Sequence, residues 1–142
     1  MAYISQEMKK ELAPAIKAVA KKYGVKVSIG INHHSSLVVK IKEGALDLIG
    51  ASNKYYEQEN ERRGFNYFGG VSDYYDINVY HSADWYRKVG AEKEANFVEE
   101  MIAAMKGTKW YDNSDAMTDY FDTAYYLTLK VGQWNKPYIY TA

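Results

Sequence analysis

Two runs of alternating apolar and polar residues near the start of the chain constrain its fold most strongly. Residues 25–31 alternate Val or Ile with Lys, Ser and Gly, and in residues 37–41 every second residue is Leu, Val or Ile. A period of two is that of a half-buried strand, whose successive side chains point to opposite faces. Residues 32–35, Asn-His-His-Ser, have the composition of a turn. We therefore expect an antiparallel hairpin.

A helix is expected before this hairpin, because apolar residues recur at helical spacing up to residue 23. Ser5 is a suitable N-cap, and Gly24 is a suitable C-terminal stop. Pro14 predicts either a kink or a late start, since proline inside a helix removes a hydrogen bond. After the hairpin, a turn is expected to lead into a third strand over residues 45–49.

The rest of the chain predicts further helices and strands. They are a polar helix over 51–63, a strand over 75–79, a short helix over 82–90, a stronger helix over 91–106, a strand over 125–131 and an edge strand over 137–140. Helices and strands are partly segregated along the chain, which is typical of an α+β fold. We expect a single α+β domain over residues 1–142. Its antiparallel sheet would have about five strands, with an N-terminal helix leading into a β-meander, covered by two or three helices.

Composition narrows the classes of protein. The 142 residues include no Cys, which excludes a disulfide framework, a thiolate zinc site and a cysteine nucleophile. No apolar run approaches the length of a membrane span, and the N-terminus lacks the pattern of a signal peptide, so we expect a cytoplasmic protein that does not enter membranes. The formal net charge is +0, which argues against general binding to duplex nucleic acid.

The charges are nevertheless unevenly distributed. Residues 1–42 contain eight Lys and two Glu, whereas the remainder contains ten Lys or Arg and sixteen Asp or Glu. Such a division favours steering of a partner or head-to-tail self-association. The alternative is that lysines simply coat the solvent face of the first helix.

Aromatic residues indicate where binding is expected. The chain has 15 Tyr, 4 Phe and 3 Trp, and ten of them fall between Tyr55 and Tyr86. Rings interleaved with basic residues suit a nucleotide, a single strand or a protein partner. The alternative is an aromatic cluster packed beneath a long loop. The binding surface predicted here consists of Lys54, Tyr55, Tyr56, Arg62, Arg63, Phe65, Tyr67 and Phe68.

His33 and His34 form a second candidate group in the predicted turn, and His81 is expected at the end of a strand. Adjacent residues on a strand point to opposite faces, so the first two do not suit one zinc ion. We include His33 and His34 in the predicted partner-binding surface. The alternative is that one imidazole packs against its neighbours while the other is solvated.

Four carboxylates are spaced three, four and three residues apart, which would place them on one face of a helix. They are Asp112, Asp115, Asp119 and Asp122. Clustered carboxylates suit Mg²⁺ or Mn²⁺ and metal-assisted phosphoryl chemistry. The alternative is that they favour the start of a short helix or pair with lysines.

Four segments carry a family resemblance: residues 17–25, 33–42, 117–122 and 132–138. Together they resemble a family of small proteins from bacteriophages and mobile elements, one of the "large polyvalent protein associated domain" families. The resemblance implies a phage origin and a counter-defence role in the cytoplasm of an infected bacterium. It brings no established catalytic residues. We expect no cofactor.

We therefore expect a non-catalytic binder that antagonises a host antiviral defence system. It would capture a small nucleotide signal or occlude a host defence protein, either as a monomer or as a homodimer; nucleic acid is a less favoured partner. Two alternatives are a metal-dependent enzyme acting on nucleotides or nucleic acids through the four carboxylates, and a structural module that assembles through an edge strand.

Overall fold

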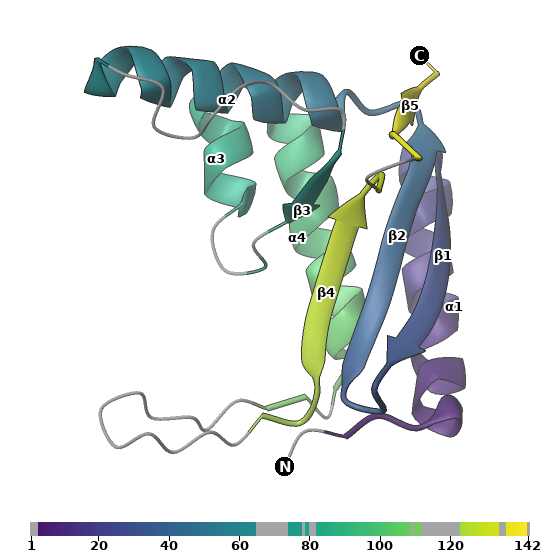
Figure 1. Ribbon diagram of the computed structural model, residues 1–142. Helices are drawn as coiled ribbons and strands as arrows, with labels where there is room; N and C mark the ends of the chain where they lie inside the picture. Colours follow the sequence, from purple (N-terminus) through teal and green to yellow (C-terminus); the bar gives the residue numbers. More distant parts are fainter. Residues whose placement is uncertain are drawn as a thin grey trace, which may run out of the picture.

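In the residues that it describes, the computed structural model has four helices and five strands, and the strands form one sheet (Figure 1). It describes residues 3–64, 74–77, 79, 82–108, 110–111, 123–133 and 136–141. The α+β class expected from the sequence is confirmed, as are a sheet of five strands and its cover of helices.

Helix α1 spans Gln6–Tyr23 and has the predicted caps. The Oγ atom of Ser5 accepts a hydrogen bond from the backbone N–H of Met8 at 3.2 Å, and Gly24 ends the helix in the left-handed conformation that glycine adopts most easily. Pro14 lies inside the helix, so the predicted late start is wrong. The buried side of α1 carries Ile16 and Ala20.

The predicted hairpin is confirmed. Strand β1, Val25–Asn32, pairs antiparallel with strand β2, Ser36–Gly44. At the turn, the backbone N–H of Ser35 donates to the carbonyl of Asn32 at 3.2 Å. The central residues, His33 and His34, have φ angles of 54° and 55°, as a type I′ turn requires. Residues other than glycine adopt this conformation at a cost in free energy.

The strand expected over residues 45–49 is wrong, because helix α2, Leu48–Arg63, begins there. Asp47 caps this helix: its side chain accepts a hydrogen bond from the backbone N–H of Gly50 at 3.1 Å. Leu46 and Leu48 are buried in the core, which explains why this segment resembles a strand in sequence. The polar helix predicted over 51–63 is confirmed, with an earlier start.

The prediction of an antiparallel sheet is wrong, because the sheet is mixed. It contains three further strands: β3, Tyr75–Ile77; β4, Tyr126–Val131; and β5, Ile139–Tyr140. The strand order is β1-β2-β4-β3, and both β4 and β5 run parallel to β2. Helices α3, Ser82–Lys88, and α4, Glu92–Lys106, belong to the long connection between β2 and β4. This long connection brings the chain back to the end of the sheet where β2 begins, so that β4 can run parallel to β2. A short hairpin turn would make the two strands antiparallel.

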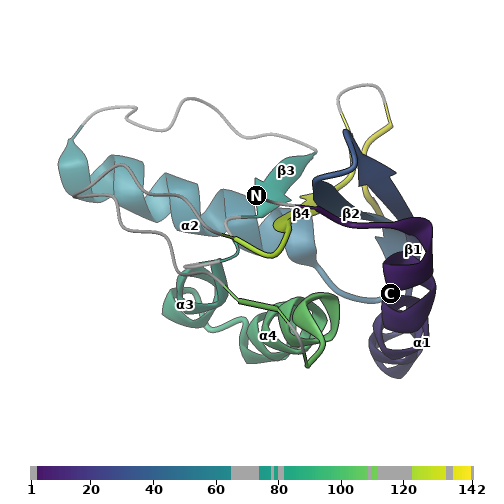
Figure 2. The same ribbon diagram turned by 90° about the horizontal axis from the view of Figure 1, so that it is seen from below.

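Helices α1 and α4 lie on the same side of the sheet (Figure 2), where the core is formed. On β2, Leu37, Val39 and Ile41 are fully buried in the same cluster as Phe97 and Met101 of α4. Because strand side chains alternate, the residues between them face the opposite side of the sheet. We call this opposite side, which no described helix covers, the open face.

The strained turn yields a prediction of stability. Replacing His33 by Asn and His34 by Gly supplies the residue pair that type I′ turns favour, so we expect the free energy of unfolding to rise by about 1 kcal/mol. Urea denaturation measures the change. The control is the double change of both histidines to Ala, which keeps the strain; an equal gain in that control would show that relief of the backbone conformation is not the cause.

Two buried tyrosines predict how stability depends on pH. The hydroxyl of Tyr125 donates to the carbonyl of Met105 at 2.5 Å, and that of Tyr138 donates to the carbonyl of Leu46 at 2.6 Å. Burial raises the pKa of each hydroxyl to about 12. The unfolded chain releases these protons near pH 10, whereas the folded chain keeps them, so stability is unaffected below about pH 10 and falls above it.

The variant Tyr125→Phe removes one of these groups. Its urea midpoint should fall less steeply than that of the wild type as the pH rises from about 10 to 12, although its stability at neutral pH is lower. All other ionisable side chains are common to the two proteins, so the comparison isolates the contribution of Tyr125. Parallel pH profiles would contradict a protonated, buried Tyr125.

Candidate functional site

Tyr55 and Tyr56 of α2 belong to a packed aromatic cluster. The ring of Tyr55 stacks on Trp85 of α3, with centroids 5.2 Å apart, and the ring of Tyr56 lies 5.1 Å from that of Tyr75. Tyr55 is 8% exposed, and burial raises the pKa of both tyrosine hydroxyls. The space between these rings is about 10 Å³, which is too small for a ligand. Both rings therefore contribute to the attachment of α2 to α3 and β3, and their predicted role in binding stays a prediction.

The basic residues of α2 have partners close by. Nη2 of Arg62 lies 2.7 Å from Oε2 of Glu59, and Nε of Arg63 lies 3.7 Å from the same oxygen. Arg62 donates a hydrogen bond to Glu59, and this bond lowers the pKa of the Glu59 carboxyl group. The ammonium group of Lys54 donates to the carbonyl of Val89 at 3.4 Å. Arg62 and Arg63 therefore share one carboxylate near the end of the helix, while Lys54 contacts a different partner farther back along it.

The histidine turn lies at the other end of the molecule from α2 (Figure 1). The side chains of His33 and His34 are both exposed there. The carbonyl of His34 accepts a hydrogen bond from the backbone N–H of Ile4, which ties the N-terminal segment to the hairpin. The structure therefore does not bring these imidazoles together with the basic residues of α2.

Several predicted residues lie outside the described part of the chain. They are Phe65, Tyr67, Phe68, Asp112, Asp115, Asp119 and Asp122. Among the residues that are described, no three His, Asp or Glu side chains are grouped so that they could hold a metal ion.

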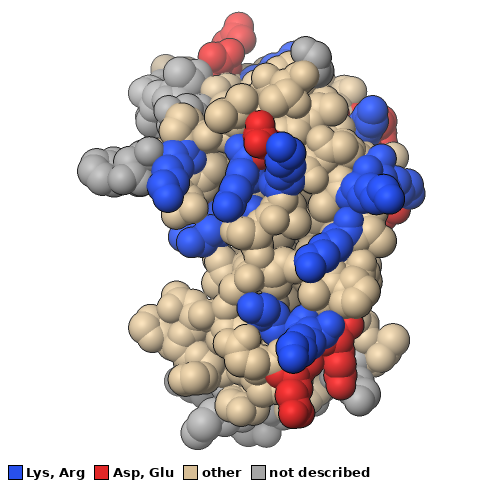
Figure 3. Space-filling view, turned by 90° about the vertical axis from the view of Figure 1, so that its right-hand side faces the viewer, with Lys and Arg blue, Asp and Glu red and all other residues tan. Residues whose placement is uncertain are grey.

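Lysines gather where the sequence analysis did not place a site. Seen from the side on which α1 and β1 lie, Lys and Arg side chains dominate over Asp and Glu (Figure 3). On the open face of the sheet, Lys40 of β2 is the direct register partner of Lys130 of β4. Like charges on adjacent strands destabilise the pairing by roughly 0.2–1 kcal/mol. Asp76 of β3 offsets part of this repulsion, 4.0 Å from Lys130.

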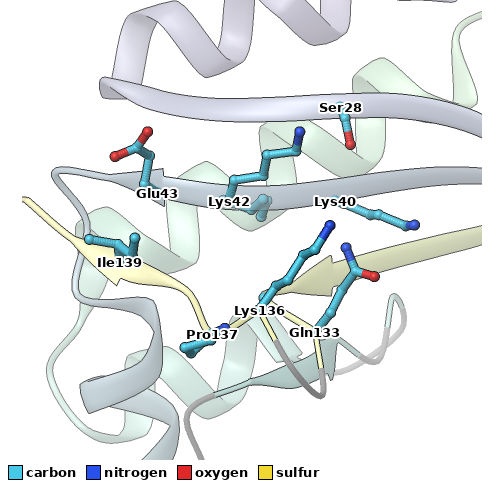
Figure 4. Close-up of a pocket in the computed structure, with 10 residues that line it drawn as sticks. Ser28, Lys40, Lys42, Glu43, Gln133, Lys136, Pro137 and Ile139 are labelled. Carbon is cyan, nitrogen blue, oxygen red and sulfur yellow. The ribbon is translucent and has the colours of Figure 1, made fainter.

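The loop between β4 and β5 adds polar groups beside these lysines. Gln133 and Lys136 exchange two backbone hydrogen bonds, at 2.8 Å and 3.0 Å, which close the loop. Their side chains extend from it toward β2, where Lys40 lies (Figure 4). Together with Ser28 of β1, these groups line a hollow of about 550 Å³.

A β-bulge places further charge at the rim of this hollow. The register of β1 and β2 shifts so that Lys42 has no direct partner on β1, while Glu43 faces Lys26. Lys26 and Glu43 form a salt bridge of 3.4 Å, so they neutralise each other. Lys42 is exposed and lines the hollow. Within the described residues, Lys40, Lys42 and Lys136 form no salt bridge, so the hollow is electropositive.

A second hollow, of about 380 Å³, continues the first along the open face. The two share Ser28 and Lys40, and the second is also lined by Thr128 and Lys130. Tyr126 projects from the same face of β4, because it is two residues from Thr128, and it is 50% exposed. The open face thus combines ammonium groups, hydroxyls and one accessible ring, which can together bind a phosphorylated molecule.

No protein-family model, curated protein or solved structure matches this chain. In the part of the chain that the structure describes, no helix combines the length and the apolar character needed to cross a membrane. The function is therefore inferred from the geometry of the open face.

Gly132 positions the loop that carries Gln133 and Lys136. Its φ angle is 72°, and a Cβ atom there would lie 2.5 Å from the backbone nitrogen of Tyr138. We expect Gly132→Ala to reduce the free energy of unfolding by about 2 kcal/mol or more. The control is Gly30→Ala on β1, where a Cβ atom meets nothing within 4 Å. Similar losses in urea denaturation of both variants would contradict this role of Gly132.

Proposed function

We propose that this protein is a non-catalytic binder that holds a phosphate-bearing ligand of the nucleotide class on the open face of its sheet. One observation carries the proposal: Lys40 and Lys130 stand side by side as register partners, next to Lys136 across a hollow. A pair of like charges weakens the sheet, and a ligand of opposite charge over it would offset the repulsion that remains beside Asp76.

The chemistry of the hollow fits a phosphorylated small molecule. Lysine ammonium groups bind phosphate as compact positive charges, and Gln133 and Ser28 can form hydrogen bonds with a sugar or a base. The volume of about 550 Å³ lies within the range of small-ligand sites. The exposed ring of Tyr126 can stack with a base.

The biological role follows from the sequence resemblance. Two of the segments that resemble phage and mobile-element proteins, residues 33–42 and 132–138, contribute Lys40, Gln133 and Lys136 to the hollow. A phage-encoded protein that captures a nucleotide signal would antagonise a host defence that depends on that signal.

Native mass spectrometry of the protein, purified gently from a bacterial host, tests ligand capture. The wild type should carry a reproducible extra mass, which Lys40→Gln combined with Lys136→Gln should abolish. The matched control is Lys93→Gln, an exposed lysine on α4, which should retain the mass. A wild-type protein without extra mass, and without heat of binding to ATP, cyclic diadenylate or inorganic triphosphate, would contradict the proposal.

Lys40→Gln also separates binding from folding. If Lys40 binds a ligand, replacing it relieves repulsion from Lys130. The free energy of unfolding of the ligand-free variant should then rise by roughly a few tenths of a kcal/mol, while its affinity for the ligand falls. Urea denaturation of ligand-free protein gives the first quantity and calorimetry the second. A variant that is less stable and binds normally would assign Lys40 to the fold instead.

A further inference from the structure

Strand β1 forms one edge of the sheet (Figure 1), and among the described strands it pairs with β2 alone. On its outer side, no described residue forms a backbone hydrogen bond with residues 26–31. An edge strand exposes a row of N–H and C=O groups that can pair with another strand.

This edge lacks the features by which proteins usually prevent such pairing. The bulge and the single lysine of β1 are confined to one end, at Lys26 and Val27. From there to Asn32 the strand contains no charged residue, no proline and no register shift. Val27, Ile29 and Ile31 are only partly buried, although they belong to the core face. An additional strand would cover them.

Positive charge flanks the same edge. Lys22 of α1 points toward α4, where its ammonium group lies 2.6 Å from Glu100. Lys10, Lys17 and Lys21 are spaced by seven and four residues, so they form one stripe on a different side of α1. All three are exposed, and none forms a salt bridge within the described residues. Basic side chains also dominate over acidic ones on the face of the molecule where α1 and β1 lie (Figure 3).

We infer that β1 accepts an extended acidic segment of a partner protein as an additional strand. The backbone of the segment pairs with the outer edge of β1, its apolar side chains cover Ile29 and Ile31, and its carboxylates lie near the lysine stripe of α1, Lys10, Lys17 and Lys21. This inference is independent of the phosphate-bearing ligand, because it uses neither Lys40 nor Lys136.

The same observations disfavour two other occupants. In a second copy paired through its own β1, a two-fold axis would bring the two lysine stripes toward each other, and like charges would repel. A nucleic acid would match the lysines, but it lacks the alternating N–H and C=O groups that pair with the edge of a strand. Only an acidic polypeptide satisfies both features.

The probe is a nine-residue peptide of alternating Val and Glu, labelled at its N-terminus, and fluorescence anisotropy measures its binding. We expect binding that weakens by about tenfold or more when alternate amides of the peptide are N-methylated, since methylation removes its edge hydrogen bonds. The triple variant Lys10→Glu, Lys17→Glu and Lys21→Glu should weaken binding by a similar factor. Hydrogen exchange should show new protection at residues 27–31.

Two controls keep the result specific. Lys93→Glu, at an exposed position of α4, should bind the peptide normally, and so should Lys40→Gln combined with Lys136→Gln. Equal affinity for the methylated peptide, or displacement of the peptide by a twelve-residue oligothymidylate, would overturn strand addition. Sedimentation that shows wild-type dimers, lost in Gly30→Pro on β1, would assign the edge to a second copy and also overturn the inference.

Discussion

The alternation of side chains along β2 is the constraint on which the rest of this structure depends. Of the strands that the structure describes, β1, β4 and β5 pair with β2, and β3 pairs with β4 instead. Leu37, Val39 and Ile41 point into the core beneath α1 and α4, while Lys40 points to the open face. A register shift of one residue would exchange these two sets and place an ammonium group in the core. The burial of three apolar side chains therefore fixes the position of the candidate site.

The parts of the fold that could be predicted from sequence are those with a clear local period. The hairpin, α1, α4 and β4 each show one, and each is present. The segment at residues 45–49 misleads because Leu46 and Leu48 are buried for reasons of tertiary packing, although Asp47 followed by Gly50 is a usable sign of a helix start. The parallel pairing of β2 with β4 could not be predicted, because local sequence patterns do not specify which distant strands pair or in which direction.

The candidate site was harder to predict than the fold. Aromatic residues in a polar sequence suggest a binding surface, but Tyr55 is buried. Its burial depends on contacts such as that with Trp85, which lies 30 residues away in the chain. Lys40 and Lys130 are ninety residues apart in the chain, and each alone is an ordinary polar position of a strand. Their proximity is a product of strand register, which sequence patterns do not specify between distant segments. A usable signal was the presence of Lys at outward positions in both strands.

Because β4 and β5 each pair with β2, the residues between them can change without a change in the sheet. β4 pairs with β2 as far as Ile41, β5 resumes the pairing at Glu43, and the bonded pair Gln133 and Lys136 lies between the two strands in sequence. Because both flanking strands are anchored independently, residues could be inserted or deleted in the loop without moving either one. Related proteins could then diversify the molecules they recognise through changes in loop length, while the scaffold beneath is inherited unchanged.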